Sequence, residues 1–94
     1  MAATLLNPDE LLNLHQTLPH WQLVDGQLER RCQFNDFVGA WGFMAQVALL
    51  AEAMNHHPDW RNVYASVTIR LSTHDLGGIS TLDLTLAEAI DRLL

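Results

Sequence analysis

Apolar and polar residues alternate along the chain with periods that change several times, and each change predicts a new element of secondary structure. Residues 7–18 carry an apolar stripe at helical spacing that begins after Asn7-Pro8, a capping residue followed by proline at the first helical position. A second proline predicts the end of this helix. Residues 21–24 and 28–34 are then typical of short strands around Asp25-Gly26, a dipeptide favoured in two-residue hairpin turns.

The second half of the chain contains a long helix, a regular strand and a final helix. Apolar residues recur at helical spacing over residues 37–55, and Pro58 predicts the end of that helix because the residue before a proline disfavours helical geometry. Residues 63–71 alternate strictly between apolar and polar, which predicts one strand with an apolar face. Two glycines end this pattern, and Ser80 or Thr81 caps the last helix.

These elements predict one domain over residues 1–94, because a chain of this length has no room for a second core. We expect an α+β fold in which an antiparallel sheet of about four strands carries three helices on one face, in the order α-β-β-α-β-β-α. Cys32 lies in an alternating apolar pattern and is interpreted as a small core residue.

Composition argues against several functional classes. Eleven acidic residues against five arginines give a formal net charge of −6, which opposes binding to nucleic acid or to an anionic membrane. Lysine is absent, which removes a Walker A site and a lysine Schiff base. One cysteine allows no internal disulfide, no apolar run approaches the length of a membrane span, and no signal peptide is recognised. We therefore expect a cytoplasmic protein.

Three of the five histidines, His56, His57 and His74, lie between residues 52 and 75. Histidine is the side chain whose ordinary pKa lies nearest neutrality, so clustered imidazoles can give and take protons at cellular pH. Glu52 precedes His56 by four residues near the end of the long helix, which predicts that its carboxylate orients that imidazole. His74 follows the regular strand, so a helix end and a strand end can bring the three rings to one pocket.

Other interpretations of these residues are open at this point. A single histidine at a helix end is more often a cap or a surface residue, and three histidines could also bind zinc, although the adjacent His56 and His57 form a poor tetrahedral chelate. Asp83 is the third residue after the Ser80 cap, and its carboxylate could do no more than interact favourably with the dipole of the last helix. Trp60 could pack in the core or stack on a planar ligand.

The spacing of these residues resembles that of the pterin-4a-carbinolamine dehydratases. The shared signature is an acidic residue, three residues, His-His-Pro, five residues, an aromatic residue, nine residues, a histidine and a later aspartate. Every element is matched at family spacing, by Glu52, His56, His57, Pro58, Tyr64, His74 and Asp83. Flanking stretches such as Phe34-Asn35-Asp36-Phe37 are also similar, so the resemblance covers nearly the whole chain from Leu11 on.

The resemblance implies an enzyme, a hydro-lyase that dehydrates 4a-hydroxytetrahydropterins to quinonoid dihydropterins. Such enzymes recycle the cofactor spent by aromatic amino-acid hydroxylases. The pterin is the substrate, and the resemblance implies neither a cofactor nor a metal, because histidines of near-neutral pKa suffice for the proton transfers.

The resemblance also implies a role for each site residue. His56 and His74 would carry proton transfer, with His57 contributing binding or electrostatics. Glu52 and Asp83 would orient the imidazoles, as carboxylates hold a catalytic histidine in one tautomer. The residues expected to bind substrate are Trp60, Thr73 and Asp75.

Two further expectations concern partners. Some relatives are non-catalytic modules, acting as transcription-factor dimerisation partners or enzyme assembly factors, but relatives of the assembly kind generally lose the histidine set that this chain keeps. Family members form dimers by joining sheets, and some form tetramers through helix packing. We expect a homodimer or homotetramer, because an edge strand over residues 63–71 would expose backbone donors and the long helix is apolar on more than one face.

Overall fold

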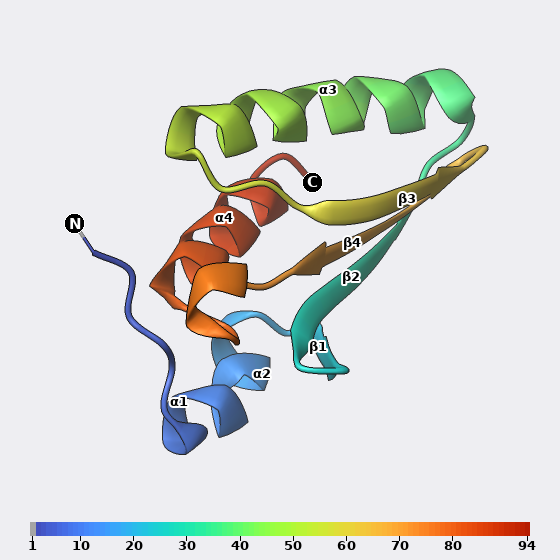
Figure 1. Cartoon of the computed structure of the whole chain (residues 1–94). Helices are drawn as coiled ribbons and strands as arrows, with labels where there is room; N and C mark the ends of the chain where they lie inside the picture. The colour runs from blue at the N-terminus through green and yellow to red at the C-terminus, as the bar shows by residue number, and fades with distance from the viewer. Residues whose placement is uncertain (1) are drawn as a thin grey trace.

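The structure, a computed structural model, describes residues 2–94. Figure 1 shows one four-stranded sheet with α3 lying along one side of it, α4 behind, and the short N-terminal helices beside β1. The strand order is β1-β2-β4-β3, and all neighbouring strands are antiparallel. This confirms the predicted α+β fold. In chain order the elements are α1 (Pro8–Leu12), α2 (Leu14–Thr17), β1 (Gln22–Val24), β2 (Gln27–Gln33), α3 (Phe37–Met54), β3 (Asp59–Val63), β4 (Ser66–Leu71), the 3-10 helix η1 (His74–Leu76) and α4 (Thr81–Asp91).

The core lies between one face of the sheet and helices α3 and α4. Val67, Ile69 and Leu71 of β4 are fully buried on that face, as their alternation predicted. Leu28 and Cys32 of β2 pair with Leu71 and Val67 across the ladder and are buried as well. Burial raises the pKa of the Cys32 thiol, in keeping with a core position. The helices contribute Ala40, Phe43, Val47, Ala51, Leu86, Ala87 and Ile90.

The predicted hairpin between β1 and β2 is confirmed. Val24 pairs with Gln27, so Asp25 and Gly26 alone form the connection. Their φ angles are 52° and 77°, as a type I′ turn requires at both central positions.

The single strand predicted over residues 63–71 is wrong. Val63 ends β3 and pairs with Ser66, the first residue of β4, so the chain reverses in a two-residue turn that begins at Tyr64. Tyr64 has a left-handed φ of 50°, and the Asn62 side-chain amide donates to the carbonyl oxygens of Tyr64 and Ser66, both at 3.0 Å. A turn of two residues preserves the alternation, which concealed it in the sequence. The edges of the sheet are therefore β1 and β3, and β4 is internal.

The N-terminal helix predicted over residues 7–18 is broken in two. Asn13 separates α1 from α2, and its N–H donates to the Asp9 carbonyl at 3.2 Å. The break directs Leu14 and Leu18 into the core, where they are 6% and 1% exposed, while Leu12 remains 71% exposed.

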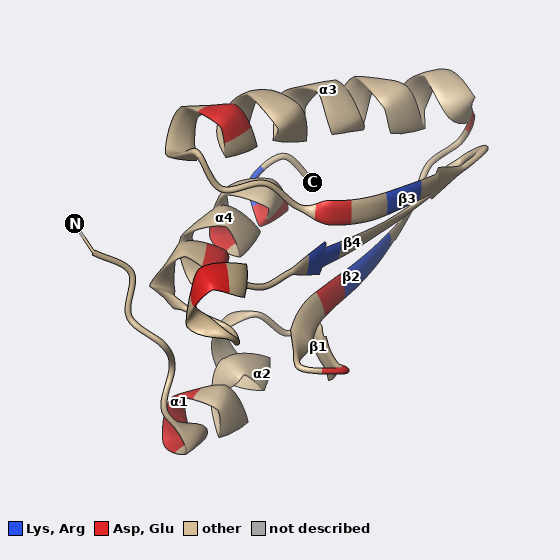
Figure 2. Ribbon diagram, viewed as in Figure 1, with Lys and Arg blue, Asp and Glu red and all other residues tan. Residues whose placement is uncertain are grey.

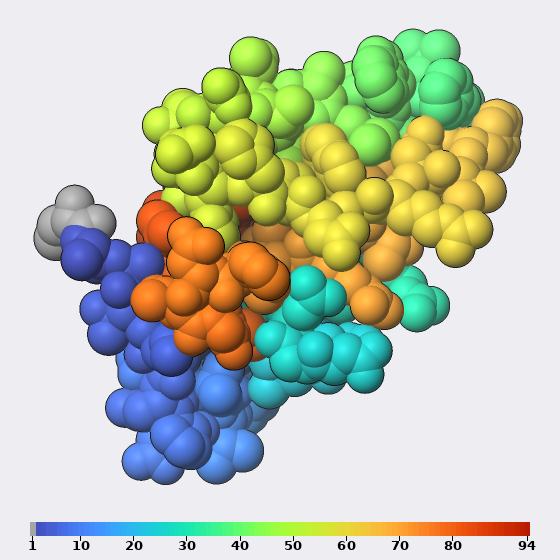
Figure 3. All heavy atoms as spheres, in the orientation of Figure 1, coloured from blue at the N-terminus to red at the C-terminus, as the bar shows by residue number. Residues whose placement is uncertain are grey.

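Residues 4–6 pair with the segment that leads into α4. The Leu6 N–H donates to the Ile79 carbonyl at 2.9 Å, and the Thr81 N–H donates to the Thr4 carbonyl at 3.0 Å. In the space-filling view of Figure 3 the dark blue N-terminal segment lies directly against the orange segment. The beginning of the chain therefore holds the loop that carries Ser80.

Helix α3 is apolar on its outer side as well as on its buried side. Val38, Trp41 and Leu49 are exposed by 76%, 59% and 74%, and in Figure 3 the green α3 forms the upper surface with no element covering it. The expectation that no apolar run reaches membrane-span length is wrong: Phe37–Met54 has a mean hydropathy of 1.4 over 18 residues and is long and apolar enough to span. The helix reaches this mean hydropathy because it is apolar on its outer side as well as its buried side. Within Phe37–Met54 only Glu52 is charged.

The hairpin turn provides a test of the local geometry. Gly26→Ala should lower the free energy of unfolding by about 1–2 kcal/mol, because a Cβ is disfavoured at positive φ even though no atom lies within 4 Å of it. Gly26→Asn is the matched control, since asparagine tolerates this conformation, and it should cost clearly less. Chemical denaturation measures both values. Equal losses would show that the turn does not demand a left-handed residue.

Candidate active site

His56 enters the protein interior because α3 ends in a left-handed turn. Asn55, directly after the last helical residue, has φ 51° and ψ 41°, and the His56 N–H donates to the Ala51 carbonyl at 3.0 Å. Helices commonly end with a residue in this conformation. The turn directs the His56 side chain inward, where 10% of it is exposed. The end of α3 falls where Pro58 predicted it.

A fully buried carboxylate receives His56. His56 Nε2 lies 2.5 Å from Oδ1 of Asp83, whose side chain has no exposed surface. The other oxygen, Oδ2, accepts from the Ser80 N–H and from the Thr73 hydroxyl, each at 2.8 Å. Asp83 is also the third helical residue in the capping box of α4. The cap and the histidine contact, which the sequence left as alternatives, therefore both occur.

The hydroxyl groups beside Asp83 form a directed chain. Thr73 gives its only hydroxyl proton to Asp83, so in the 2.5 Å contact between the Thr73 and Ser80 hydroxyls the donor is Ser80. Ser80 Oγ in turn accepts from the Leu82 N–H at 3.1 Å. Successive hydrogen bonds of this kind polarise one another, so each strengthens the next. The chain holds the Asp83 carboxylate in position for His56.

The carboxylate also determines which nitrogen of His56 carries a proton. Nε2 faces an acceptor and therefore donates, which leaves Nδ1 of the neutral ring able to accept a proton. Within residues 2–94 no buried polar side-chain atom lacks a hydrogen bond, and Nδ1 makes none, so Nδ1 reaches solvent. The arrangement matches a general base oriented by a buried carboxylate.

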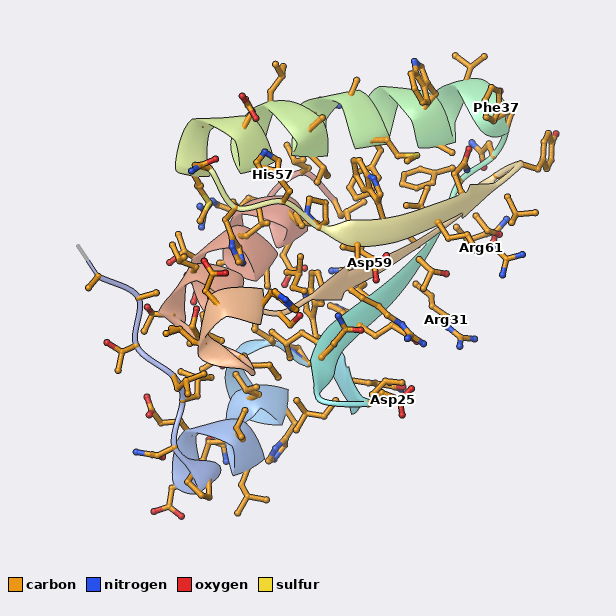
Figure 4. All side chains as sticks on the ribbon, in the orientation of Figure 1. Asp25, Arg31, Phe37, His57, Asp59 and Arg61 are labelled. Atoms are coloured by element: carbon orange, nitrogen blue, oxygen red, sulfur yellow. The ribbon has the colours of Figure 1, made fainter. Side chains whose placement is uncertain are left out.

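The predicted pairing of Glu52 with His56 is wrong, because Glu52 pairs with His57. His57 Nε2 lies 2.8 Å from Glu52 Oε1, and both side chains are mostly exposed. The left-handed residue Asn55 breaks the helical spacing on which the prediction rested, so His56 turns inward and His57 returns over the last turn of α3. Figure 4 shows His57 on the segment between α3 and β3. The site therefore has two histidine–carboxylate pairs, one buried and one at the surface.

His74 opens η1, three residues beyond the last residue of β4, and joins the other two histidines around one cavity. We call this cavity, of about 290 Å³, the histidine hollow; it is lined by Asn55, His56, His57, Ser72, Thr73, His74, Asp75 and Leu82. His74 is exposed, and within residues 2–94 its ring makes no hydrogen bond. The expected convergence of a helix end and a strand end is thus present in the structure.

The structure places the three expected substrate-binding residues differently from one another. Asp75 is exposed at the histidine hollow. Thr73 also lines it, but its hydroxyl is already committed to Asp83, which suits it to positioning. Trp60 pairs with Ile69 on the core-facing side of the sheet, packs against the core and lies outside the histidine hollow.

Sequence reasoning missed some residues of the site. Ser80 was recognised only as a helix cap, although its hydroxyl and N–H both support Asp83. Gln27 and Ser72 were not singled out; the Gln27 amide donates to Ser72 Oγ at 3.1 Å beside the histidines. Gln27 and Ser72 could have been noticed because each occupies a polar position in an alternating strand pattern. Within residues 2–94, no three His, Cys, Asp or Glu side chains gather closely enough to hold a metal ion.

Comparison with known protein families shows which family the chain belongs to. The family model described as pterin 4 alpha carbinolamine dehydratase matches residues 4–93. The chain belongs to this family. Proteins provisionally named pterin-4-alpha-carbinolamine dehydratase are similar to it over nearly their whole length: one from Prochlorococcus marinus (strain MIT 9313) is 58% identical, covering 99% of this chain and 97% of that protein. One from Synechococcus sp. (strain WH7803) is 58% identical, covering 97% and 98%.

A solved structure supports the same family at the level of the fold. The crystal structure of a transcriptional coactivator/pterin dehydratase from Brucella melitensis has a TM-score of 0.89 and 40% sequence identity to this chain. The similarity covers 95% of this chain and 97% of that one. The names of the relatives are those of a hydro-lyase, which confirms the enzyme class and the family that the residue spacing indicated.

Replacement of Asp83 tests the buried network. Asp83→Asn should lower the free energy of unfolding by about 2–4 kcal/mol, because the amide places a donor where the carboxylate accepts from three groups. Glu88→Gln, an exposed change of the same type on α4, should alter stability by no more than about 0.5 kcal/mol. Denaturant titration measures both. A loss as small for Asp83→Asn as for the control would contradict the network.

Proposed function

We propose that this protein dehydrates a 4a-hydroxytetrahydropterin to the quinonoid dihydropterin by histidine acid–base catalysis. In this reaction the C4a–O bond breaks, the departing oxygen takes a proton and leaves as water, and the N5 lone pair forms the N5=C4a double bond. N5 then loses its proton to a base. The chemistry needs one proton donor and one acceptor on either side of a small planar ring.

The observation that carries the proposal is the buried Asp83–His56 pair beside a second, unpaired histidine. Asp83 holds His56 with Nε2 as donor, so Nδ1 is the acceptor for the N5 proton. His74 lines the same histidine hollow without a partner among residues 2–94, and it is our candidate for the acid that protonates the leaving oxygen. His57, held by Glu52, contributes charge and orientation at the rim. The reaction so described uses neither a cofactor nor a metal.

The dehydratase proposal is favoured over a purely non-catalytic role. The Brucella melitensis structure carries a name that joins coactivator and dehydratase. In the present chain the complete histidine set is built around a cavity, and a buried carboxylate fixes one ring. Such an arrangement serves proton transfer, whereas an assembly role alone does not require it. We further propose that the enzyme acts in the cytoplasm, alongside an aromatic amino-acid hydroxylase that forms the carbinolamine.

Histidine variants test the proposed roles. His56→Ala and His74→Ala should each lower kcat for carbinolamine dehydration about 10- to 1000-fold, since general acid–base groups contribute about 10²–10⁴ and a neighbouring ring replaces part of this. Their combination should leave almost no activity. His20→Ala, an exposed histidine outside the hollow, is the control and should retain full activity. Stopped-flow absorbance follows the reaction, with and without EDTA.

Two outcomes would contradict this assignment. A double variant with the kcat of the unaltered enzyme would place the proton transfers elsewhere. Loss of activity in EDTA that zinc restores would show a metal-dependent reaction.

We also propose that the chain forms a homo-oligomer through the outer side of α3 and a sheet edge. The support is the apolar outer side, with Trp41 and Leu49 well exposed, and the two edge strands β1 and β3. A dimer would form by joining sheets, and a tetramer by packing α3 helices of two dimers.

Light scattering should give a mass at least twice 10.6 kDa at micromolar concentration. Leu49→Glu should reduce that mass, because a charge would be buried between helices. Leu12→Glu, at an equally exposed leucine on α1, should leave it unchanged. A monomeric mass for the unaltered chain would refute the oligomer, and a mass unaffected by Leu49→Glu would remove α3 from the interface.

A further inference from the structure

The face of the sheet opposite α3 carries a second group of charged side chains. The register places Glu29, Arg70 and Asp59 side by side on β2, β4 and β3. Figure 2 shows blue and red positions crossing these three adjacent strands, and Figure 4 shows Asp59 on the side of β3 away from α3. The next row along the strands is Arg31, Thr68 and Arg61, in the same strand order. Three of the five arginines therefore gather on one face.

A buried carboxylate fixes two of these arginines. Glu29 is only 4% exposed, and its two oxygens accept from Arg31 Nε at 3.1 Å and from Arg70 Nε at 2.8 Å. Burial alone would raise the pKa of Glu29, but the hydrogen bonds and charges of Arg70 and Arg31 outweigh it and lower the pKa below its usual value. Both guanidinium groups are thus held by Nε, and their terminal nitrogens can donate to a ligand. Asp25 lies near one of them, 4.0 Å from Arg70 Nη1.

The third arginine has no protein partner. Arg61 is exposed on β3 and makes no ion pair within residues 2–94. Arg31 and Arg61 stand on either side of Thr68, so a ligand above Thr68 can meet both guanidinium groups. Together with Glu29, Asp59, Trp60 and Arg70 these residues line a cavity of about 460 Å³, which we call the arginine hollow. Guanidinium groups present paired donors that suit carboxylate and phosphate oxygens.

A third cavity, of about 270 Å³, shares lining residues with both the arginine hollow and the histidine hollow. It shares His57, Ser72 and His74 with the histidine hollow. It shares Asp59 and Arg70 with the arginine hollow. Ser72, Arg70 and Thr68 are successive residues on the open side of the chain, so each step covers roughly 7 Å at about 3.3 Å per residue. A molecule whose ring lies at the histidines can extend its side chain along β4 to the arginines.

We infer that the substrate is a pterin whose ring substituent ends in an anionic group, a carboxylate or phosphate, bound by Arg31, Arg61 and Arg70. The inference rests on the proposed dehydration and specifies its substrate class. A short anionic side chain would reach only Arg70, while a longer one would reach Arg31 and Arg61 on either side of Thr68. The net charge of the whole chain strengthens the case. Although the chain carries a formal charge of −6, three arginines and only two carboxylates line this cavity.

Equilibrium binding of product analogues tests the inference without requiring catalysis. Three dihydropterins are compared by calorimetry: one with a methyl side chain, one with a short phosphate monoester, and one with a p-aminobenzoylglutamate side chain. At least one anionic compound should bind about 10-fold or more tightly than the methyl compound, with the difference shrinking as salt is raised. Comparison of the two anionic compounds shows whether the phosphate or the carboxylate compound binds more tightly. Equal affinity for all three compounds overturns the inference.

Arginine variants locate the contact. Arg61→Gln and Arg31→Gln should each weaken binding of the long anionic compound about 3- to 10-fold, and leave binding of the methyl compound unchanged. Arg92→Gln, at an exposed arginine beyond α4, is the matched control and should change neither. A preference for the long anionic compound that survives when Arg31→Gln and Arg61→Gln are combined overturns the inference. So does a combined variant whose main effect is a changed mass in light scattering, since that would make this face an interface between copies.

Turnover separates this inference from the proposed function. With the methyl-substituted carbinolamine, the arginine variants should dehydrate at the rate of the unaltered enzyme, while the histidine variants should not. Failure of the unaltered enzyme to dehydrate any carbinolamine defeats the proposed function. Dehydration without any anionic preference defeats only the substrate class.

Discussion

A carboxylate without access to water must find donors in the protein, and Asp83 finds them in three segments that are distant in sequence. The segment after α3 supplies an imidazole, the segment after β4 supplies a hydroxyl, and the cap of α4 supplies an N–H. An unpaired charge at this depth would cost several kcal/mol, so the three segments are held together for as long as Asp83 is buried. The arrangement of the histidines depends on this contact more than on any other.

The same contact makes stability and chemistry inseparable at this end of the molecule. Ser80 caps α4 and also completes the hydroxyl chain through Thr73, so the helix cap and the support of His56 are one structure. The Glu52–His57 pair differs in kind. Both of its members are mostly exposed, and exposed pairs contribute little to folding, so this pair can be altered with little effect on the core.

Much of the fold was predictable because its signals are local. The capped start of α1, the Asp25-Gly26 turn, the extent of α3 and the α4 cap each depend on a few neighbouring residues, and each was found. The turn at Tyr64 was missed because two residues can reverse a chain without disturbing a period of two. The break at Asn13 was missed because the burial of Leu14 and Leu18 is a tertiary effect.

The candidate site shows the same limit of sequence reasoning. Residue types and spacing picked out the three histidines and both carboxylates, but helical spacing assigned Glu52 to the wrong ring because a single left-handed residue, Asn55, follows the helix. The partner of His56 lies 27 residues away, and no local rule connects the two. The arginine hollow was also invisible, since it depends on the order of strands in the sheet: β4 lies between β2 and β3, although it follows both in the chain.

The pairing of residues 4–6 with residues 79–81 has a consequence for how the protein is made. The loop that carries Ser80 rests against the first few residues of the chain, and the acceptor for His56 lies just beyond it in α4. Synthesis must therefore have passed residue 83 before the His56 imidazole can meet its carboxylate, which lies 27 residues further along the chain. Until residues 79–83 have been made, His56 lacks its acceptor and residues 4–6 lack the segment with which they pair.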